Sequence, residues 1–162
     1  MRSGRRPAAL IKTDSPVLVT GGGGFLGKAI VRQLVASDFS VRSFSRRCHD
    51  DLTEMGVEQV QGDLGDKDAV RNAVEGVEVV FHTAAKPPPW GRYADYFRAN
   101  TVGTDNLVQA CQRQGIAALV HTSSPSVIFD GGDLEGVDES IPYPARYLSH
   151  YAQTKALAEQ CG

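Results

Sequence analysis

Four consecutive glycines lie between a short apolar stretch and a longer amphipathic one, and this junction limits the folds open to the chain. Residues 16–20 read Pro-Val-Leu-Val-Thr, which predicts a buried strand, while residues 25–36 carry apolar side chains at helical spacing. Gly21, Gly24 and Gly27 lie three residues apart across the junction. A flexible linker is the alternative, but the strand before the glycines and the helix after them favour a tight strand-to-helix turn.

A turn of this kind is suited to hold a pyrophosphate. The first glycine permits the tight turn, the second lets a phosphate approach the backbone, and the third lets the helix pack against the strand. The free amides and the dipole of the helix N-terminus attract the anion. The sequence therefore predicts a dinucleotide site, whose residues at this turn are Gly21, Gly24, Phe25, Leu26 and Gly27.

Strand patterns alternate with helical patterns along the rest of the chain. Further strands are expected at residues 40–45, 57–61, 77–82 and 116–122. Further helices are expected at residues 66–74, 93–114 and 147–160, and residues 125–144 are expected to form a loop. Asp66 is a plausible N-cap, and Gly115 is expected to end the long helix. Strands joined by helical crossovers predict an α/β fold, a doubly wound parallel sheet of the Rossmann type.

Composition excludes several classes of protein. The 162 residues carry 17 Lys and Arg against 19 Asp and Glu, so we expect no nucleic-acid binding driven by overall charge. Three cysteines without C-x-x-C spacing argue against a disulfide scaffold or a metal site and favour a reducing, cytoplasmic location. The chain holds no apolar run near the roughly 20 residues that span a bilayer.

The pattern also predicts how the chain is divided. Residues 1–14 are basic but lack an apolar core, so we expect a mobile N-terminal extension rather than a signal peptide. Residues 15–162 are expected to form a dinucleotide-binding domain. A doubly wound sheet normally continues with another strand after its last helix, so this domain is expected to be incomplete at its C-terminus.

The residues after the second expected strand bear on which dinucleotide binds. In such folds an acidic side chain about 20 residues after the glycines bonds the adenosine ribose 2′-hydroxyl. This chain has Ser45 there, followed by Arg46 and Arg47. Guanidinium groups bind phosphate oxygens bidentately, which favours NADP over NAD. The alternative is that both arginines are solvated loop charges.

Two further segments end strands at the predicted cofactor edge. Asp63 and Leu64 are candidates to bond and cover the adenine, although a turn aspartate is a nearly equal alternative for Asp63. The small residues Thr83, Ala84 and Ala85 suit close passage of the cofactor, because ligands of doubly wound folds bind at the carboxyl edge of the sheet. The histidine just before them is expected to face a neighbouring side chain rather than to catalyse.

A serine, a tyrosine and a lysine form the candidate catalytic set. Tyr151 and Lys155 lie four residues apart and therefore on one helix face. Both are also expected to contact the cofactor, because the ammonium can bond the nicotinamide ribose. A free tyrosine has a pKa near 10, and a nearby ammonium favours the phenolate that a proton transfer needs. Ser124 follows the fifth strand, where its hydroxyl could hold a substrate oxygen. Each feature alone is common on ordinary surfaces, and their occurrence together in a dinucleotide fold favours catalysis.

These motifs together resemble the extended short-chain dehydrogenase/reductases. The resemblance rests on the glycine turn, Asp63-Leu64, His82-Thr83-Ala84-Ala85, the Asn100 to Asn106 segment and the Tyr151/Lys155 pair. Residues 122–129 and 142–144 are similar to the 3β-hydroxysteroid dehydrogenase branch, which includes sterol-4α-carboxylate 3-dehydrogenases and bacterial 2-alkyl-3-oxoalkanoate reductases.

The resemblance implies particular roles and a function. Ser124 would anchor the substrate oxygen, and Tyr151 would donate or accept the proton. Lys155 would activate Tyr151, and Asn100 would have a structural role. The implied activity is NAD(P)-dependent interconversion of a secondary alcohol and a ketone on a bulky apolar small molecule, in a homodimer. An NAD-dependent nucleotide-sugar epimerase or dehydratase and a non-catalytic nucleotide-binding fragment are the alternatives, and Ser45 departs from the acid of NAD-using relatives.

Overall fold

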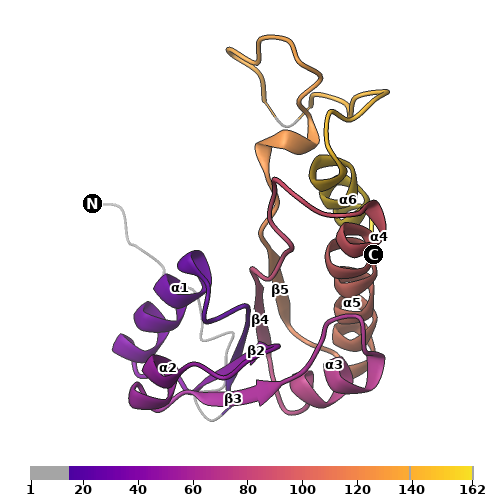
Figure 1. Cartoon of the computed structure of the whole chain (residues 1–162). Coiled ribbons are helices and arrows are strands. Elements are labelled where there is room, and N and C mark those ends of the chain that lie inside the picture. The colour runs from indigo at the N-terminus through magenta and orange to yellow at the C-terminus, as the bar shows by residue number, and fades with distance from the viewer. Residues whose placement is uncertain (1–14, 139, 162) are drawn as a thin grey trace, which may run out of the picture.

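A five-stranded parallel sheet forms the centre of the molecule, as the sequence predicts (Figure 1). The computed structural model describes residues 15–138 and 140–161, so the predicted extension at residues 1–14 lies outside the described residues. The strands are β1 (Val17–Thr20), β2 (Val41–Ser45), β3 (Glu58–Gln61), β4 (Val79–His82) and β5 (Ala118–His121). They lie in the order β3-β2-β1-β4-β5, and every neighbouring pair is parallel.

Helices cover both faces of this sheet (Figure 1). They are α1 (Phe25–Ala36), α2 (Asp50–Glu54), α3 (Lys67–Val74), α4 (Tyr93–Tyr96), α5 (Gly103–Gln114) and α6 (His150–Glu159), with a π-helical segment η1 (Phe97–Val102) and a 3₁₀ turn η2 (Pro125–Val127). Alternate side chains of β1 enter opposite layers: Val19 packs with Val31 of α1, and Leu18 packs with Leu107 of α5. The doubly wound fold is confirmed.

The ends of the elements follow local chemistry. Asp66 caps α3 as predicted, because its side chain accepts hydrogen bonds from the amides of Asp68 and Ala69. Gly115 ends α5 with a φ of 67°, the left-handed conformation that favours glycine. Helix α6 begins later than predicted, because the side chain of Ser149 accepts from the amide of Ala152 and so sets the first turn.

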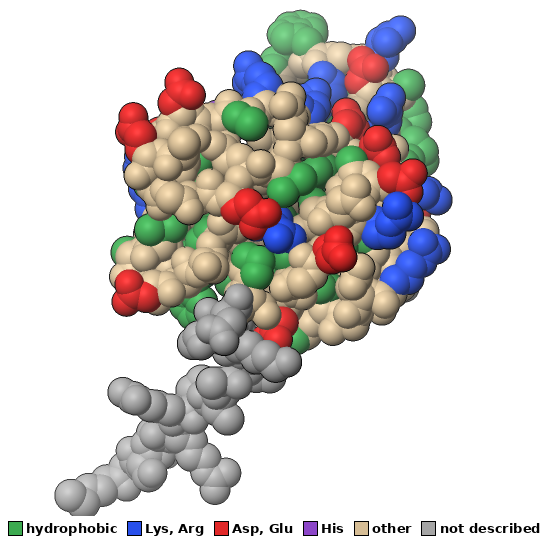
Figure 2. All heavy atoms as spheres, turned by 90° about the horizontal axis from the view of Figure 1, so that it is seen from below, with side chains coloured by type: hydrophobic (Ala, Val, Ile, Leu, Met, Phe, Trp, Pro, Cys, Tyr) green, Lys and Arg blue, Asp and Glu red, His purple; other side chains and the backbone are tan. Residues whose placement is uncertain are grey.

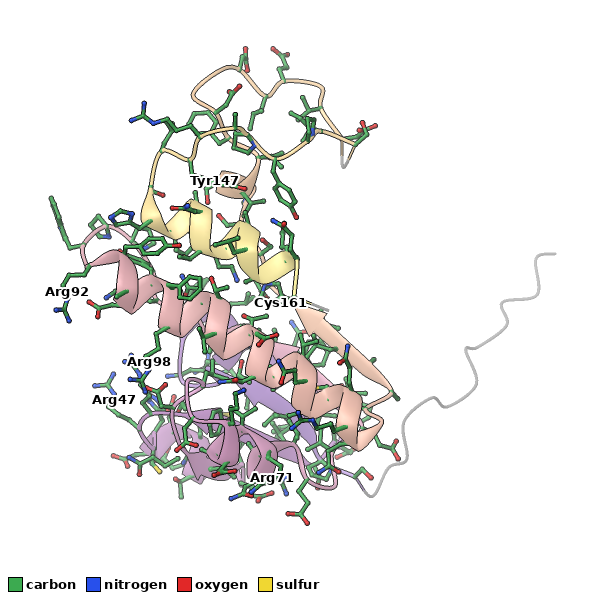
Figure 3. All side chains as sticks on the ribbon, turned by 90° about the vertical axis from the view of Figure 1, so that its right-hand side faces the viewer. Arg47, Arg71, Arg92, Arg98, Tyr147 and Cys161 are labelled. Carbon is green, nitrogen blue, oxygen red and sulfur yellow. The ribbon has the colours of Figure 1, made fainter. Side chains whose placement is uncertain are left out.

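The predicted long helix is one continuous run with a local change of pitch. Residues 93–114 pass from α4 through η1 into α5, and α6 lies alongside this run (Figure 3). The predicted loop between β5 and α6 contains η2 and is otherwise irregular among the residues that the structure describes. Within residues 15–138 and 140–161, no helix combines the length and apolarity needed to cross a bilayer.

Charges of both signs share the surface. Figure 2 shows basic side chains gathered toward one side of the visible face, while acidic side chains lie on both sides of it. The visible face therefore carries charges of both signs and is not uniformly acidic.

Candidate functional site

The carboxyl ends of three strands meet at one edge of the sheet. Thr20 of β1 pairs with His82 of β4, and His82 pairs with His121 of β5. The chain leaving each of these strands carries predicted site residues. Parallel pairing therefore brings segments from three distant parts of the sequence to one edge, where doubly wound folds bind their ligands.

The glycine turn at the end of β1 is compact and depends on missing side chains. Gly21 adopts a φ of 72°, and its carbonyl accepts a hydrogen bond of 2.9 Å from the amide of Gly24. A Cβ on Gly27 would overlap the Gly21 carbonyl oxygen, and one on Gly21 would lie 3.0 Å from the Cα of Ala84. The turn thus places α1 and the end of β4 in close contact with β1.

The first turn of α1 leaves its amides open. The N-cap is Gly24, which has no side chain that could accept a hydrogen bond from these amides. Phe25 is 99% exposed and Leu26 is 44% exposed, so both side chains stand beside the helix N-terminus rather than in the core. Unpaired amides at a helix N-terminus attract anions. This glycine-lined cradle therefore fits the pyrophosphate of a dinucleotide.

The two predicted phosphate-binding arginines follow β2 with exposed side chains. Ser45 Oγ donates to the Arg47 carbonyl at 2.5 Å, and Gln61 Nε2 donates to the Arg46 carbonyl at 3.0 Å. These bonds hold the backbone, and both side chains are exposed on the described part of the molecule, where they could reach a ligand. Arg47 projects from the molecule on the same side as Arg98 in Figure 3.

Asp63 serves its own turn in this structure. Its Oδ1 accepts a hydrogen bond of 2.7 Å from the amide of Gly65 and lies 3.7 Å from Arg98 Nη2. The carbonyl of Leu64 accepts a hydrogen bond of 2.8 Å from Asn106 Nδ2. The Leu64 side chain packs against the core beside α5. These contacts agree with the turn interpretation of Asp63, and an adenine contact stays a prediction.

The segment after β4 is tied to β1. Thr83 Oγ1 donates to the Thr20 carbonyl at 2.7 Å, and the amide of Ala84 donates to Thr20 Oγ1 at 3.3 Å. Ala85, the next residue, is exposed. The small side chains of this segment therefore border the glycine turn and leave its outer side accessible.

His82 is buried and fully bonded, in agreement with its expected role as a packed strand residue. Thr104 Oγ1 donates to the Asn100 carbonyl, so it accepts from His82 Nε2 at 2.9 Å. Thr20 Oγ1 then donates to His82 Nδ1 at 2.6 Å. Burial, with lesser effects of His121 and Lys155, lowers the pKa of His82 to about 3, so the ring is neutral at pH 7.

Asn100, in the π-helical segment, connects three parts of the site. Its Oδ1 accepts from the amide of Lys86 at 2.7 Å, and its Nδ2 donates to the Lys86 carbonyl at 3.3 Å and to Thr154 Oγ1 at 3.1 Å. Only 1% of Asn100 is exposed. It therefore joins the loop after β4 to α6, which agrees with the structural role that the resemblance implies.

Lys155 reaches from α6 to the end of β5. Its Nζ donates to the Thr122 carbonyl at 2.7 Å and lies 3.1 Å from His121 Nε2. The residue is 2% exposed, and burial lowers the pKa of Lys155 to about 8 although Glu159 acts in the opposite direction. His121 is a contact of this lysine that was not predicted from the sequence, although its place beside Thr122 at a strand end was a usable signal.

The other two candidate catalytic residues flank this lysine without bonding it. Tyr151 lies one turn before Lys155 on α6 and is half-buried. Ser124 caps η2: its Oγ accepts from the amide of Ser126 at 3.3 Å and lies 2.9 Å from Ser126 Oγ. Within the part of the chain that the structure describes, Ser124, Tyr151 and Lys155 share one edge but make no hydrogen bonds to one another.

An open cavity of about 670 Å³ lies beside Ser124. Its walls are mostly apolar and include Val127, Ile128, Val137 and Ile141. At its rim Tyr143 donates a hydrogen bond of 2.7 Å to Glu159 Oε2, which raises the pKa of Tyr143 to about 12. Among the described residues no cluster of His, Cys, Asp or Glu could hold a metal ion.

The fold and its ligand edge define a Rossmann-type dinucleotide-binding domain of the short-chain dehydrogenase/reductase kind. Residues 18–161 match the 3-beta hydroxysteroid dehydrogenase/isomerase family, and the chain belongs to that family. It is 45% identical over 152 residues to a 2-alkyl-3-oxoalkanoate reductase of Shewanella oneidensis, in an alignment that covers 94% of this chain and 39% of the relative.

Solved structures agree with this placement. A short-chain dehydrogenase/reductase superfamily protein of Agrobacterium tumefaciens with bound NAD superposes with a TM-score of 0.79 at 32% identity, over 90% of this chain and 43% of that one. The Thermus thermophilus UDP-glucose 4-epimerase complex with NAD superposes with a TM-score of 0.78 at 33% identity, over 90% of this chain and 49% of that one. The chain spans less than half the length of these relatives. Its family is one of NAD(P)-dependent oxidoreductases.

Proposed function

We propose that the protein is an NAD(P)-dependent oxidoreductase that interconverts a secondary alcohol and a ketone on a bulky apolar substrate. One observation carries the proposal: α6 holds Lys155 at the end of β5, one turn from Tyr151, on the edge that bears the glycine turn. The family name and the Shewanella relative favour a hydroxysteroid or a long-chain 2-alkyl-3-oxoalkanoate as substrate. The apolar cavity beside Ser124 is compatible with either.

The cofactor residues follow the edge described above. The pyrophosphate would lie over Gly21, Gly24 and Gly27. The remaining contacts would come from Phe25, Leu26, Arg46, Arg47, Asp63, Leu64, Thr83, Ala84, Ala85, Tyr151 and Lys155. The bound cofactor supplies or accepts a hydride at the carbinol carbon.

Residues of this chain handle the proton that accompanies the hydride. The Tyr151 hydroxyl gives a proton to the ketone oxygen in reduction, or takes it from the alcohol in oxidation. Lys155 would activate Tyr151 from one helical turn away, and the Ser124 hydroxyl would hold the substrate oxygen.

Substitution of Tyr151 tests the proposed reaction. Tyr151→Phe removes the proton donor and should lower kcat by at least about 100-fold, while the affinity for the cofactor changes little. Tyr147→Phe removes a hydroxyl just before the same helix and serves as the control. Retained turnover in Tyr151→Phe would contradict the assignment.

We propose NADP as the preferred cofactor, with NAD as the weaker ligand. Ser45 in place of an acid and the exposed, backbone-anchored Arg46 and Arg47 support this preference. Joint replacement of both arginines by alanine should weaken NADPH binding about 10-fold or more and leave NADH binding nearly unchanged, as measured by calorimetry. Arg71→Ala, an exposed change on α3, is the control, and tighter binding of NADH than NADPH by the unaltered protein would contradict the preference.

A nucleotide-sugar epimerase is the second candidate, because the Thermus epimerase complex shares the fold at 33% identity. It predicts tightly held NAD⁺ that copurifies with the protein and turnover of a UDP-sugar. A non-catalytic nucleotide-binding protein is the third candidate, and it predicts nucleotide binding by calorimetry without turnover of any ketone or alcohol.

The assembly and the compartment are also proposals. Unpaired thiols at Cys48, Cys111 and Cys161 fit a reducing cytoplasm. The partly exposed stacked rings of Tyr93 and Phe97 on the long helical run fit a homodimer contact there. Sedimentation velocity distinguishes a dimer from a monomer.

A further inference from the structure

His121 has an environment that differs from that of any other histidine in the described chain. The ring lies between Lys155 of α6 and His82 of β4: its Nε2 is 3.1 Å from Lys155 Nζ, and the two ring centroids are 5.1 Å apart. Its Nδ1 is buried without a hydrogen-bond partner in the described part of the chain. Every polar contact of the His121 side chain is therefore directed at the lysine.

The charges around the His121 ring decide which group donates the hydrogen bond and which accepts it. Lys155 and Glu159 act on the ring from α6, and His82 faces it from β4. Burial and then Lys155 lower the pKa of His121 to about 4, so the ring is neutral at physiological pH. An ammonium only donates hydrogen bonds, so a neutral His121 must accept at Nε2 and carry its proton on Nδ1. Lys155 then has two acceptors, His121 Nε2 and the Thr122 carbonyl.

We propose that His121 is a positioning residue: its Nε2 accepts a hydrogen bond from the Lys155 ammonium and holds that charge at the end of β5, one helical turn from Tyr151. This inference rests on the proposed role of Lys155 in the reaction. The buried ammonium would otherwise keep a single carbonyl acceptor, because water has little access to it. Loss of an acceptor disfavours the charged form of a buried lysine and leaves its position less defined.

A pair of matched amides tests the contact. The carboxamide of His121→Gln extends to where Nε2 lies and can accept from Lys155, whereas the shorter side chain of His121→Asn reaches only to the level of Nδ1. Both variants place a neutral amide in the same buried space. We expect the pKa of Lys155, followed by NMR of its Cε and Nζ, to stay near 8 in His121→Gln and to fall by about one unit in His121→Asn.

The pH profile of turnover provides the functional measurement. The alkaline limb of kcat/KM should move to lower pH by about one unit in His121→Asn, with kcat reduced about 10-fold and the substrate KM little changed. In His121→Gln the alkaline limb of kcat/KM should lie at the same pH as in the unaltered protein. Equal effects of both amides, or a protonated Nε2 in the NMR spectrum at pH 7, would overturn the inference.

The two proposals fail in different ways. Retained turnover in Tyr151→Phe overturns the proposed reaction, while the difference in the pKa of Lys155 between the two amide variants still decides the contact with His121. An unchanged pKa of Lys155 in His121→Asn overturns the contact, even where Tyr151→Phe is inactive.

Discussion

A missing methyl group at Gly27 decides how closely α1 approaches β1. The space that a Cβ would need is already filled by the carbonyl of Gly21 and the side chain of Thr83. Backbone atoms cannot move aside as the end of a flexible side chain can. The third glycine of the turn is therefore a packing requirement as well as part of the predicted phosphate cradle.

Gly27→Ala should disturb both stability and binding. We expect a loss of about 1–3 kcal/mol in the free energy of unfolding, because the added methyl forces the turn and helix apart. The affinity for NADPH should fall about 10-fold or more, because the amides of α1 move from their positions. Urea denaturation and calorimetry measure the two effects.

Gly132→Ala is the matched control for this change. Its added methyl would meet only the carboxylate of Asp130, which can turn away into solvent. Equal stability and affinity in Gly27→Ala and Gly132→Ala would show that close packing at the turn is unimportant.

At the scale of elements, the π-helical segment η1 places Asn100 where three parts of the chain meet. A π-helical turn rotates the following side chains relative to a regular helix and often occurs at functional sites. Asn100 bonds both backbone groups of Lys86 and the hydroxyl of Thr154, so it connects the loop after β4 to α6. Together with the hydrogen bond from Thr101 Oγ1 to the Thr154 carbonyl, this amide therefore helps to hold α6 against the loop after β4.

Asn100→Ala should destabilise the chain by about 2–3 kcal/mol, since the partly buried amide of Lys86 loses its hydrogen-bond acceptor and Thr154 loses the bond from Nδ2. Asn72→Ala, on the exposed side of α3, should change the free energy of unfolding by less than about 0.5 kcal/mol. Urea unfolding curves measure both. Similar stabilities of the two variants would contradict the connecting role of Asn100.

At the scale of the whole molecule, two neutral histidines make the fold sensitive to acid. Burial lowers the pKa of His82 to about 3 and that of His121 to about 4, below the ordinary histidine value of 6.5. The unfolded chain binds these protons near pH 6.5 and the folded chain does not. Their contribution to stability is therefore complete above about pH 6.5 and is lost as the pH falls toward the folded values.

We expect the free energy of unfolding to fall between pH 6.5 and pH 5, with a slope from His82 alone that approaches about 1.4 kcal/mol per pH unit near pH 5. His121 adds to the loss in the same direction. Urea unfolding at several pH values measures this slope. His82→Gln does not titrate and should flatten it, and an unchanged slope in that variant would contradict the prediction.

Local chemistry accounts for what was predictable about the fold. The glycine turn, the cap at Asp66 and the stop at Gly115 each depend on residues close in sequence, and the structure confirms the elements that they delimit. The predicted start of α6 was wrong, because the Ser149 side chain caps a helix that begins three residues later than predicted. The π-helical pitch of η1 was missed. It occurs where Asn100 bonds Lys86 and Thr154, which are 14 and 54 positions away in the sequence.

The amino-acid sequence by itself determined the doubly wound fold, the position of the glycine turn and the residue types available for proton transfer, because strand and helix periodicity and turn chemistry are local properties. Only the tertiary structure decided that Lys155 lies against His121, that His82 is neutral between two threonines, and that Asn100 joins the loop after β4 to α6. Those contacts join segments that meet only when parallel strands align their carboxyl ends. Their strength depends on burial, which no local pattern encodes.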